Sequence, residues 1–276
     1  ANKKNKVYET QYMVNEDVYE KHLNNEMLIF PADPVIEDFI FIGWYNAEDT
    51  KITTSDIMSS DTTLYAHFEA IEKWDGVTLT EPSRIEDITS PYDGWYQINK
   101  ATELAWVAAK TKTALVTDNL YITTDIDLDN KPWTPLGVSS SFNGNIEGNG
   151  HTIKNINLAP AAGVKYYGFI GQTNNTASVI ANLNVTGLMR ISTSNSSINM
   201  GGLIGKANGV DSIINCHSKV DVVLEDGGSV AYLGGLIGLV KNTQIVGCSY
   251  SGTMTLSGGQ VAKGWAGLIG TFNSTV

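Results

Sequence analysis

The residues best suited to chemistry are three aspartates at alternating positions, Asp125, Asp127 and Asp129. Alternate carboxylates begin a calcium-binding loop, which also needs a glycine at its sixth position and a glutamate at its twelfth. Those two positions hold Asn130 and Leu136 in this chain. On an extended strand the intervening residues would face inward and the aspartates outward. We therefore predict a solvated strand edge, with weak calcium binding as the alternative.

The four histidines are scattered through the chain, and none stands at the spacing of metal ligands. His151 lies between Gly150 and Thr152 in a turn-rich segment. No nucleophile or carboxylate is spaced from it in a way that suggests a catalytic triad. We predict a structural hydrogen bond for His151 and single, unrelated positions for the others, which are His22, His67 and His217.

The composition indicates that strands and turns, rather than helices, support these residues. Only 17% of the residues are charged and 27 are glycine, a mixture that favours short strands joined by tight turns. The net charge of −11 is uneven: residues 1–70 carry −8, residues 71–136 carry −5 and residues 137–276 carry +2. An acidic chain without a basic stripe is unsuited to binding nucleic acid. No run of 18 apolar residues occurs, so we expect no transmembrane helix.

One tetrapeptide occurs four times in the second half of the chain, at spacings of 34, 33 and 32 residues. Its copies are Gly168–Gly171, Gly202–Gly205, Gly235–Gly238 and Gly267–Gly270. A second, apolar motif follows each of the first three copies, at 179–183, 212–216 and 244–248. No single unit can bury its apolar side alone, whereas stacked coils pile like residues into ladders and pair their strands in parallel. The prediction is a parallel, right-handed β-helix with about three short strands per coil.

A single helix is predicted over residues 101–109, with Asn99 as its N-cap. Leu104, Val107 and Ala108 share one face of this helix. The helix directly precedes the first coils, and an uncovered coil would expose unpaired backbone groups beside apolar side chains. We therefore expect the helix to cap the N-terminal end of the β-helix.

Residues 9–70 alternate apolar and polar side chains as the strands of a small β domain do. Pro31 and Pro34 mark a rigid extended crossing between strands. Two longer motifs follow, Phe39-x-Phe41-x-Gly43-Trp44-Tyr45 and Asp61-x-Thr63-Leu64-Tyr65-Ala66. In this order and spacing, the prolines and the two motifs resemble the Listeria–Bacteroides repeat, also called the internalin B-repeat.

This resemblance implies a small β-grasp-like module, usually a spacer or adhesive unit of secreted surface proteins. Where the family usually has glycine before the aromatic strand, this chain has Asp38. We interpret Trp44 as a core aromatic and Tyr45 as a rim aromatic, because aromatic side chains contribute large buried areas. Carbohydrate stacking is the alternative for both.

The tetrapeptides, with the Gly-rich segment 142–158 before them, resemble the GLUG-motif domains of bacterial adhesins and large secreted surface proteins. The resemblance covers residues 94–276 and implies an extracellular β-helix used in adhesion or surface architecture. We expect further coils beyond Val276. The expected organisation is a tail at 1–8, the repeat-like module at 9–70, a linker at 71–90 and the β-helix at 91–276, with repeats at 168–201, 202–234, 235–266 and, in part, 267–276.

The two cysteines occupy the same position of successive repeats. Stacking would place Cys216 and Cys248 in one inward ladder with Leu183 as its third member, because buried cysteine behaves as a small hydrophobe. We predict two reduced, buried thiols, with a disulfide between coils as the alternative.

A polysaccharide-degrading enzyme is the main functional alternative, because many such enzymes are parallel β-helices. Glycoside hydrolases need two carboxylates held close together, and lyases of this fold commonly need a calcium cluster with a basic residue. Arginine occurs only as Arg84 and Arg190. From residue 137 onward there are five acids, and they are not laddered across coils: Glu147, Asp211, Asp221, Glu225 and Asp226. We therefore predict no catalytic residue, no metal and no cofactor.

The function expected from these features is that of a non-enzymatic, secreted bacterial cell-surface protein, adhesin-like or a structural and binding scaffold. Its partner would be an extracellular protein or glycan, and the chain would be monomeric. A polysaccharide-degrading or polysaccharide-binding β-helix protein is the alternative, since fold alone does not decide function.

Overall fold

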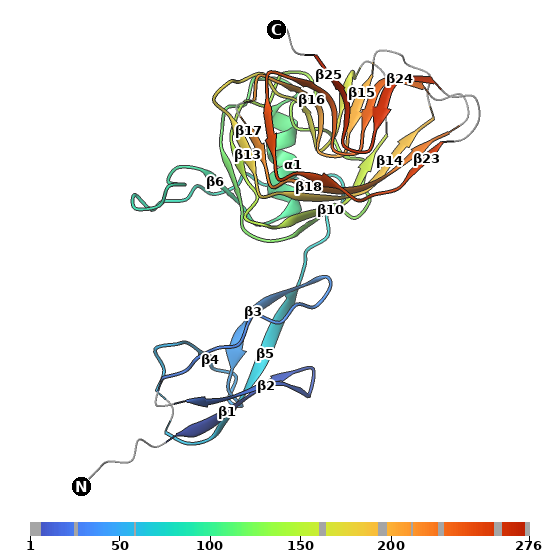
Figure 1. The fold of residues 1–276 in the computed structure, drawn as a ribbon. Coiled ribbons are helices and arrows are strands. Elements are labelled where there is room, and N and C mark those ends of the chain that lie inside the picture. Colours follow the sequence, from blue (N-terminus) through green and yellow to red (C-terminus); the bar gives the residue numbers. More distant parts are fainter. Residues whose placement is uncertain are drawn as a thin grey trace. The chain divides into compact units, whose positions relative to one another are not determined.

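The computed structural model describes residues 7–24, 27–57, 59–159, 164–192, 198–210, 212–225, 229–256 and 261–273. Residues 1–6 of the predicted tail (1–8) and the end of the last partial repeat (274–276) lie outside this part. The chain divides into two compact units, Ala1–Ile71 and Glu72–Val276, which differ in architecture (Figure 1). Strands make up most of the regular secondary structure of the described residues, which contain a single helix, as predicted.

The first unit is a mixed five-stranded sheet in the order β2-β1-β5-β3-β4. The first and last strands lie side by side in its centre and run parallel, which is the arrangement of a β-grasp sheet. Trp44 is only 1% exposed and its ring meets that of Tyr12 at 4.8 Å, so the predicted core role of Trp44 is confirmed. The strands are β1 (Tyr8–Val14), β2 (Asp17–Asn24), β3 (Phe39–Tyr45), β4 (Lys51–Ile52) and β5 (Thr62–Ala70).

Asp38 occupies the turn before β3 with a φ of 63°. This left-handed conformation suits glycine, and aspartate is one of the few other residues that adopt it readily. The backbone carbonyl of Asp38 accepts a hydrogen bond from the Ile71 N–H at 2.9 Å. The departure from the glycine of the resembled family therefore leaves the turn intact.

The second unit is a parallel β-solenoid, as predicted, whose coils contribute strands to four sheets. Each coil thus has about four strands rather than the three expected, because the tetrapeptide lies at a corner between two of them. The first sheet holds β6 (Tyr96–Ile98), β7 (Leu120–Ile122), β9 (Ile146–Glu147), β13 (Val179–Ala181), β17 (Ser212–Ile214) and β21 (Gln244–Val246). The second holds β8 (Ile126–Asp127), β10 (Thr152–Leu158), β14 (Asn184–Ile191), β18 (His217–Leu224), β22 (Ser249–Tyr250) and β23 (Met254–Leu256). The third holds β11 (Tyr166–Tyr167), β15 (Asn199–Gly201), β19 (Ser229–Gly234) and β24 (Val261–Ala266), and the fourth β12 (Ile170–Gln172), β16 (Ile204–Asn208), β20 (Ile237–Lys241) and β25 (Ile269–Phe272).

Equivalent residues of the tetrapeptides stack directly on one another. Ile170, Ile204, Ile237 and Ile269 pair in register along the fourth sheet. The glycines that begin the tetrapeptides have no positive φ. A Cβ atom on Gly202 would instead lie 2.6 Å from the Gly235 carbonyl oxygen of the next coil, so close approach between coils requires glycine there.

The helix α1 (Ala101–Lys110) lies at the N-terminal end of the solenoid, directly after β6, which is the outermost strand of its sheet. In Figure 1 the helix is seen inside the outline of the coils. Leu104 and Val107 are fully buried in the solenoid core. The helix therefore covers the apolar interior of the first coils, as expected for a cap.

The predicted N-cap was wrong by one residue, since Lys100 takes that position. The Glu103 carboxylate accepts hydrogen bonds from the backbone N–H groups of Asn99 (2.7 Å) and Lys100 (3.1 Å). The Asn99 side-chain oxygen accepts instead from the Thr123 hydroxyl at 2.6 Å. The Asn99 side chain, predicted to cap the helix, thus bonds to a neighbouring coil instead.

Residues 72–90 do not form the expected linker, because they belong to the second unit. Trp74 is 6% exposed and packs edge-on against Trp133, with ring centroids 6.0 Å apart. Its backbone N–H donates to the Asp127 carbonyl at 3.1 Å. The guanidinium of Arg84 lies over the Tyr96 ring at 3.9 Å. One tryptophan and one arginine therefore fix this polar stretch to the solenoid.

Candidate functional site

The three alternating aspartates do not form the solvated edge that the sequence suggested. Asp127 is fully buried, and its Oδ1 accepts hydrogen bonds from the Asn155 amide (2.8 Å) and the Asp129 N–H (2.7 Å). The segment around Trp74 covers Asp127. The alternation of side chains along one strand could not reveal this covering segment. Asp129 turns away to pair with Lys131 at 3.2 Å.

Asp125 is tied to the next coil. Its carboxylate lies 3.0 Å from the Lys154 ammonium and 3.6 Å from His151 Nδ1, and it accepts the Thr152 N–H at 2.9 Å. Burial alone would raise the pKa of Asp125, but these hydrogen bonds outweigh it and lower the pKa to about 2. The ring of His151 therefore lies beside a carboxylate of the preceding coil, at a distance longer than a hydrogen bond.

No three histidine, cysteine or acidic side chains gather into a metal-binding group within the described residues. The remaining histidines have separate local partners. His22 contacts Glu20 at 2.8 Å, His67 stacks on the Tyr45 ring at 4.1 Å, and His217 Nδ1 lies 2.8 Å from the Ser249 hydroxyl.

The two cysteines occupy adjacent rungs of one ladder, above the buried Leu183. The Cys216 N–H donates to Cys248 Sγ at 3.4 Å, and both thiols are free. Cys216 is buried as expected, whereas Cys248 is half-buried. The hydrogen bond between the thiols, followed by burial, raises the pKa of Cys216; the same hydrogen bond lowers the pKa of Cys248 to about 7.

The acids of the later coils also serve as structural acceptors. Asp221 accepts the N–H and the hydroxyl of Thr253 at 2.8 and 2.7 Å, and Glu225 pairs with Arg190 at 2.5 Å. Asp211 and Asp226 lie outside the described residues. The carboxylates that can be placed therefore join one coil to the next rather than facing a shared cavity.

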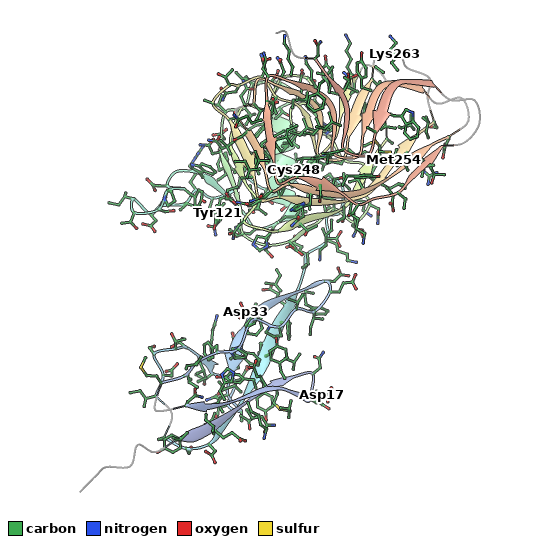
Figure 2. All side chains as sticks on the ribbon, in the orientation of Figure 1. Asp17, Asp33, Tyr121, Cys248, Met254 and Lys263 are labelled. Carbon is green, nitrogen blue, oxygen red and sulfur yellow. The ribbon has the colours of Figure 1, made fainter. Side chains whose placement is uncertain are left out.

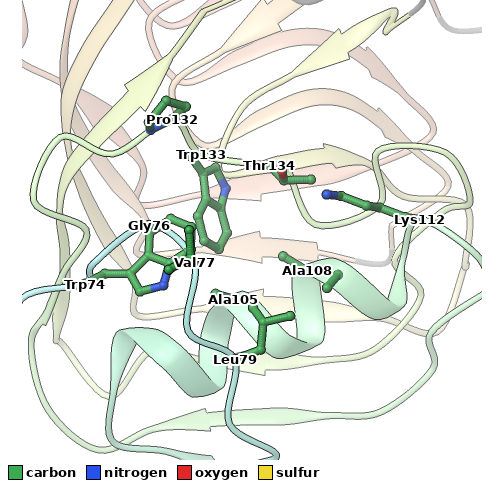
Figure 3. A pocket seen from close by; sticks show the side chains of 11 residues that line it. Trp74, Gly76, Val77, Leu79, Ala105, Ala108, Lys112, Pro132, Trp133 and Thr134 are labelled. Carbon is green, nitrogen blue, oxygen red and sulfur yellow. The ribbon is translucent and has the colours of Figure 1, made fainter.

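A pocket of about 180 Å³ lies beside α1 (Figure 3). Its floor is the helix face that carries Ala105 and Ala108, and its walls include Trp74 and Trp133. Both indole N–H groups are already used, since Trp74 donates to the Thr78 carbonyl (3.1 Å) and Trp133 to the Phe169 carbonyl (3.0 Å). Lys112 supplies the single charged side chain of the lining, so the pocket has no acid and base pair.

The best candidate for a binding site is a group of three partly exposed rings, which we call the aromatic patch: Tyr92, Trp95 and Tyr121. The rings of Tyr92 and Tyr121 lie 4.5 Å apart, and those of Tyr92 and Trp95 meet edge-on at 5.1 Å. Tyr121 is the central residue of β7, between two fully buried neighbours. Its side chain therefore points away from the core, and Figure 2 shows it near the base of the projecting segment 85–94.

Two polar side chains flank the aromatic patch along the first sheet. Tyr121 pairs in register with Gln97 of β6 on one side and with Glu147 of β9 on the other. The Glu147 carboxylate is held by the Asn149 N–H at 2.7 Å and the Asn182 amide at 3.0 Å. Burial, then the charge of Glu147 and the neighbouring Tyr121, raises the pKa of Tyr92. The result is a row of amide, phenol and carboxylate beside two ring contacts, one tilted and one edge-on.

Sequence reasoning missed this patch. The useful signal was the alternation in each strand, which turns Gln97 and Tyr121 outward. Pairing between strands 24 residues apart then places these two side chains together, and that register is not visible in a single sequence.

Comparisons with known proteins identify part of the first unit. The described part of the chain contains no helix with the length and apolarity needed to cross a membrane. Neither the curated proteins nor the solved structures include a match to the chain. Residues 4–67 match the family model of the Listeria-Bacteroides repeat domain.

Proposed function

We propose that this chain is a non-enzymatic, secreted cell-surface protein of adhesin-like type, in which the β-solenoid serves as a scaffold for binding an extracellular protein or glycan. The match of residues 4–67 supports a surface-type protein, because this repeat is typical of such proteins. The resemblance of the stacked tetrapeptides to GLUG-motif domains supports the adhesin-like role.

The non-enzymatic part of the proposal rests on one observation: the carboxylates with shifted pKa values serve as structural acceptors. General acid catalysis on a glycoside needs a carboxyl group whose pKa is raised. Burial alone would raise the pKa of Asp118, but hydrogen bonds from Arg84 and Lys110 lower it. Hydrogen bonds from Thr253 lower the pKa of Asp221. Together with Asp125, these groups stay ionised and hold neighbouring segments together.

A screen for turnover tests this proposal against the polysaccharide-degrading alternative. The purified chain is incubated with pectic and host-type glycans, with and without calcium, and released reducing ends and unsaturated products are measured. We expect none above a heat-denatured control. Turnover that is abolished by Glu147→Gln or Asp221→Asn would overturn the non-enzymatic assignment.

Location is tested separately on intact cells. Antibody labelling and loss of the protein after brief external proteolysis are the expected results for a surface protein. Retention of the whole chain inside protease-treated cells would contradict the surface role.

A further inference from the structure

We propose that the aromatic patch, with Gln97 and Glu147, is a binding site for a neutral saccharide chain. The inference rests on the proposed binding role of the solenoid and names the ligand class for it. The apolar face of a sugar ring would lie against the rings of Tyr121 and Trp95. Hydroxyl groups on its edge would bond to the Gln97 amide and the Glu147 carboxylate.

The spacing of the row fits a chain of sugar rings. Gln97, Tyr121 and Glu147 stand on consecutive parallel strands, which lie about 4.8 Å apart in the direction of their hydrogen bonds. That step is close to the width of one pyranose ring. A saccharide chain lying along the solenoid axis would therefore place successive rings over successive strands.

The chemistry of the row matches the surface of a sugar. Saccharides present a C–H face, which packs on aromatic rings, and a rim of hydroxyls, which need both donors and acceptors. The amide of Gln97 offers both, the phenols of Tyr92 and Tyr121 offer both, and the carboxylate of Glu147 accepts. A carboxylate has about four lone-pair positions, so the contacts from Asn149 and Asn182 leave room for a hydroxyl donor.

Charge selects neutral over acidic sugars. Glu147 lies at one end of the row, and its charge, after burial, contributes to the raised pKa of Tyr92. Asp87 and Asp93 lie on the segment that carries Tyr92, and both are exposed. A uronic acid or sialic acid at this place would meet like charge, which costs affinity.

Hydrogen bonds close the segment that carries Tyr92. Residues 85 and 94–95 are joined by the Ile85 N–H to the Trp95 carbonyl (2.9 Å) and by the Gly94 N–H to the Ile85 carbonyl (2.8 Å). Within the segment, the Asp93 carboxylate accepts the Asp87 N–H at 3.0 Å. These hydrogen bonds restrict the loop before binding, and preorganisation of this kind favours affinity.

A purely structural role would use the same ring contacts to fasten segment 85–94 to the sheet, so the test must separate the two roles. Affinity electrophoresis of the full chain is run in gels containing cellulose-, mannan- or xylan-derived neutral polymers, with polygalacturonate as the acidic counterpart. Calorimetry with the corresponding hexasaccharides gives the dissociation constants. Retardation by at least one neutral polymer, and none by polygalacturonate, is the expected result.

Two variants and a matched control locate the binding. Tyr121→Ala should weaken binding about tenfold, the upper value for one aromatic contact, and Gln97→Ala should weaken it without disturbing the ring packing. Tyr166→Ala removes a partly exposed tyrosine from β11, on another sheet, and should leave affinity unchanged. Thermal melting of each variant checks that the solenoid remains folded.

The outcomes discriminate clearly. The inference would be overturned if no neutral polymer bound, or if polygalacturonate alone bound. It would also be overturned if the folded Tyr121→Ala and Gln97→Ala chains bound the polymer as tightly as the unsubstituted chain. Each of these results would leave the proposed surface role standing. Cleavage of a bound polymer would instead refute the non-enzymatic proposal while keeping the site. A Tyr121→Ala chain that unfolds leaves Gln97→Ala to decide.

Discussion

Replacing Leu104 with alanine tests whether α1 closes the N-terminal end of the solenoid. Leu104 is fully buried within the solenoid core. Truncation removes three carbons that contact the first coils and leaves a cavity, because the surrounding β-strands can collapse only partly. The matched control is Leu115→Ala, which makes the same chemical change at a residue that is 56% exposed.

The expected magnitudes of the two changes differ clearly. Leu→Ala changes at fully buried sites cost about 2.7–5.0 kcal/mol, so we expect the free energy of unfolding of the second unit to fall by about 3 kcal/mol. In a unit of this size each kcal/mol lowers the Tm by about 2–4 °C, which gives a shift of about 6–12 °C. Leu115→Ala should change the free energy of unfolding by no more than about 0.5 kcal/mol.

Differential scanning calorimetry of the full chain measures both effects, because two separately cooperative units give two transitions. The Leu104→Ala shift should be confined to the transition of the second unit. Introducing aspartate at both Leu104 and Val107 should in addition promote oligomers, detected by light scattering, because the exposed end of a coil offers unpaired strand edges. Equal shifts for Leu104→Ala and Leu115→Ala would refute the capping role.

Three further perturbations probe the contacts between coils. Asp125→Asn should lower the free energy of unfolding by about 1–2 kcal/mol at neutral pH, allowing for partial exposure. The folded-state pKa of about 2 lies below the unfolded value of about 3.9. The difference, measured by urea titration, should therefore persist above about pH 4 and vanish as the pH falls through about 2. Gly202→Ala should lower the free energy of unfolding by about 1–3 kcal/mol through overpacking. Gly267→Ala should be nearly neutral, because its added Cβ would meet only a Tyr250 ring carbon at 3.6 Å. Equal losses of stability in thermal melts would contradict the argument that close approach between coils requires glycine at Gly202. Titration with a thiol reagent should detect Cys248 in the native chain and Cys216 only after denaturation, while no thiol in either state would reveal a disulfide.

The solenoid could be predicted because its evidence is repeated along the sequence. Four copies of one tetrapeptide at nearly constant spacing indicate stacked coils, since each copy must find the same environment as the last. The common ladder of Leu183, Cys216 and Cys248 followed from that register alone. The number of strands per coil could not be predicted in this way. The corner at each tetrapeptide depends on backbone turns that glycine permits but does not specify.

The errors arose where an unrepeated segment covers the repeats. Asp127 alternates with apolar residues as an exposed side chain would, yet the segment around Trp74 lies over it. The same tryptophan explains why residues 72–90 are not a linker, since a single buried indole can anchor a stretch that is otherwise polar. Local patterns describe a strand and its two faces; they carry no information on what a distant segment lays over one of those faces.

The parallel pairing of β1 and β5 has a mechanical consequence for the first unit. Tension on the two ends of this module pulls the start of β1 and the end of β5 in opposite directions along their length. The hydrogen bonds that join Thr10–Met13 to Thr62–Tyr65 then resist as a group in shear, rather than opening one after another as they would if peeled apart. A module with this strand order keeps its fold under load until these hydrogen bonds break together, a property that would suit a spacer unit of the surface protein proposed above.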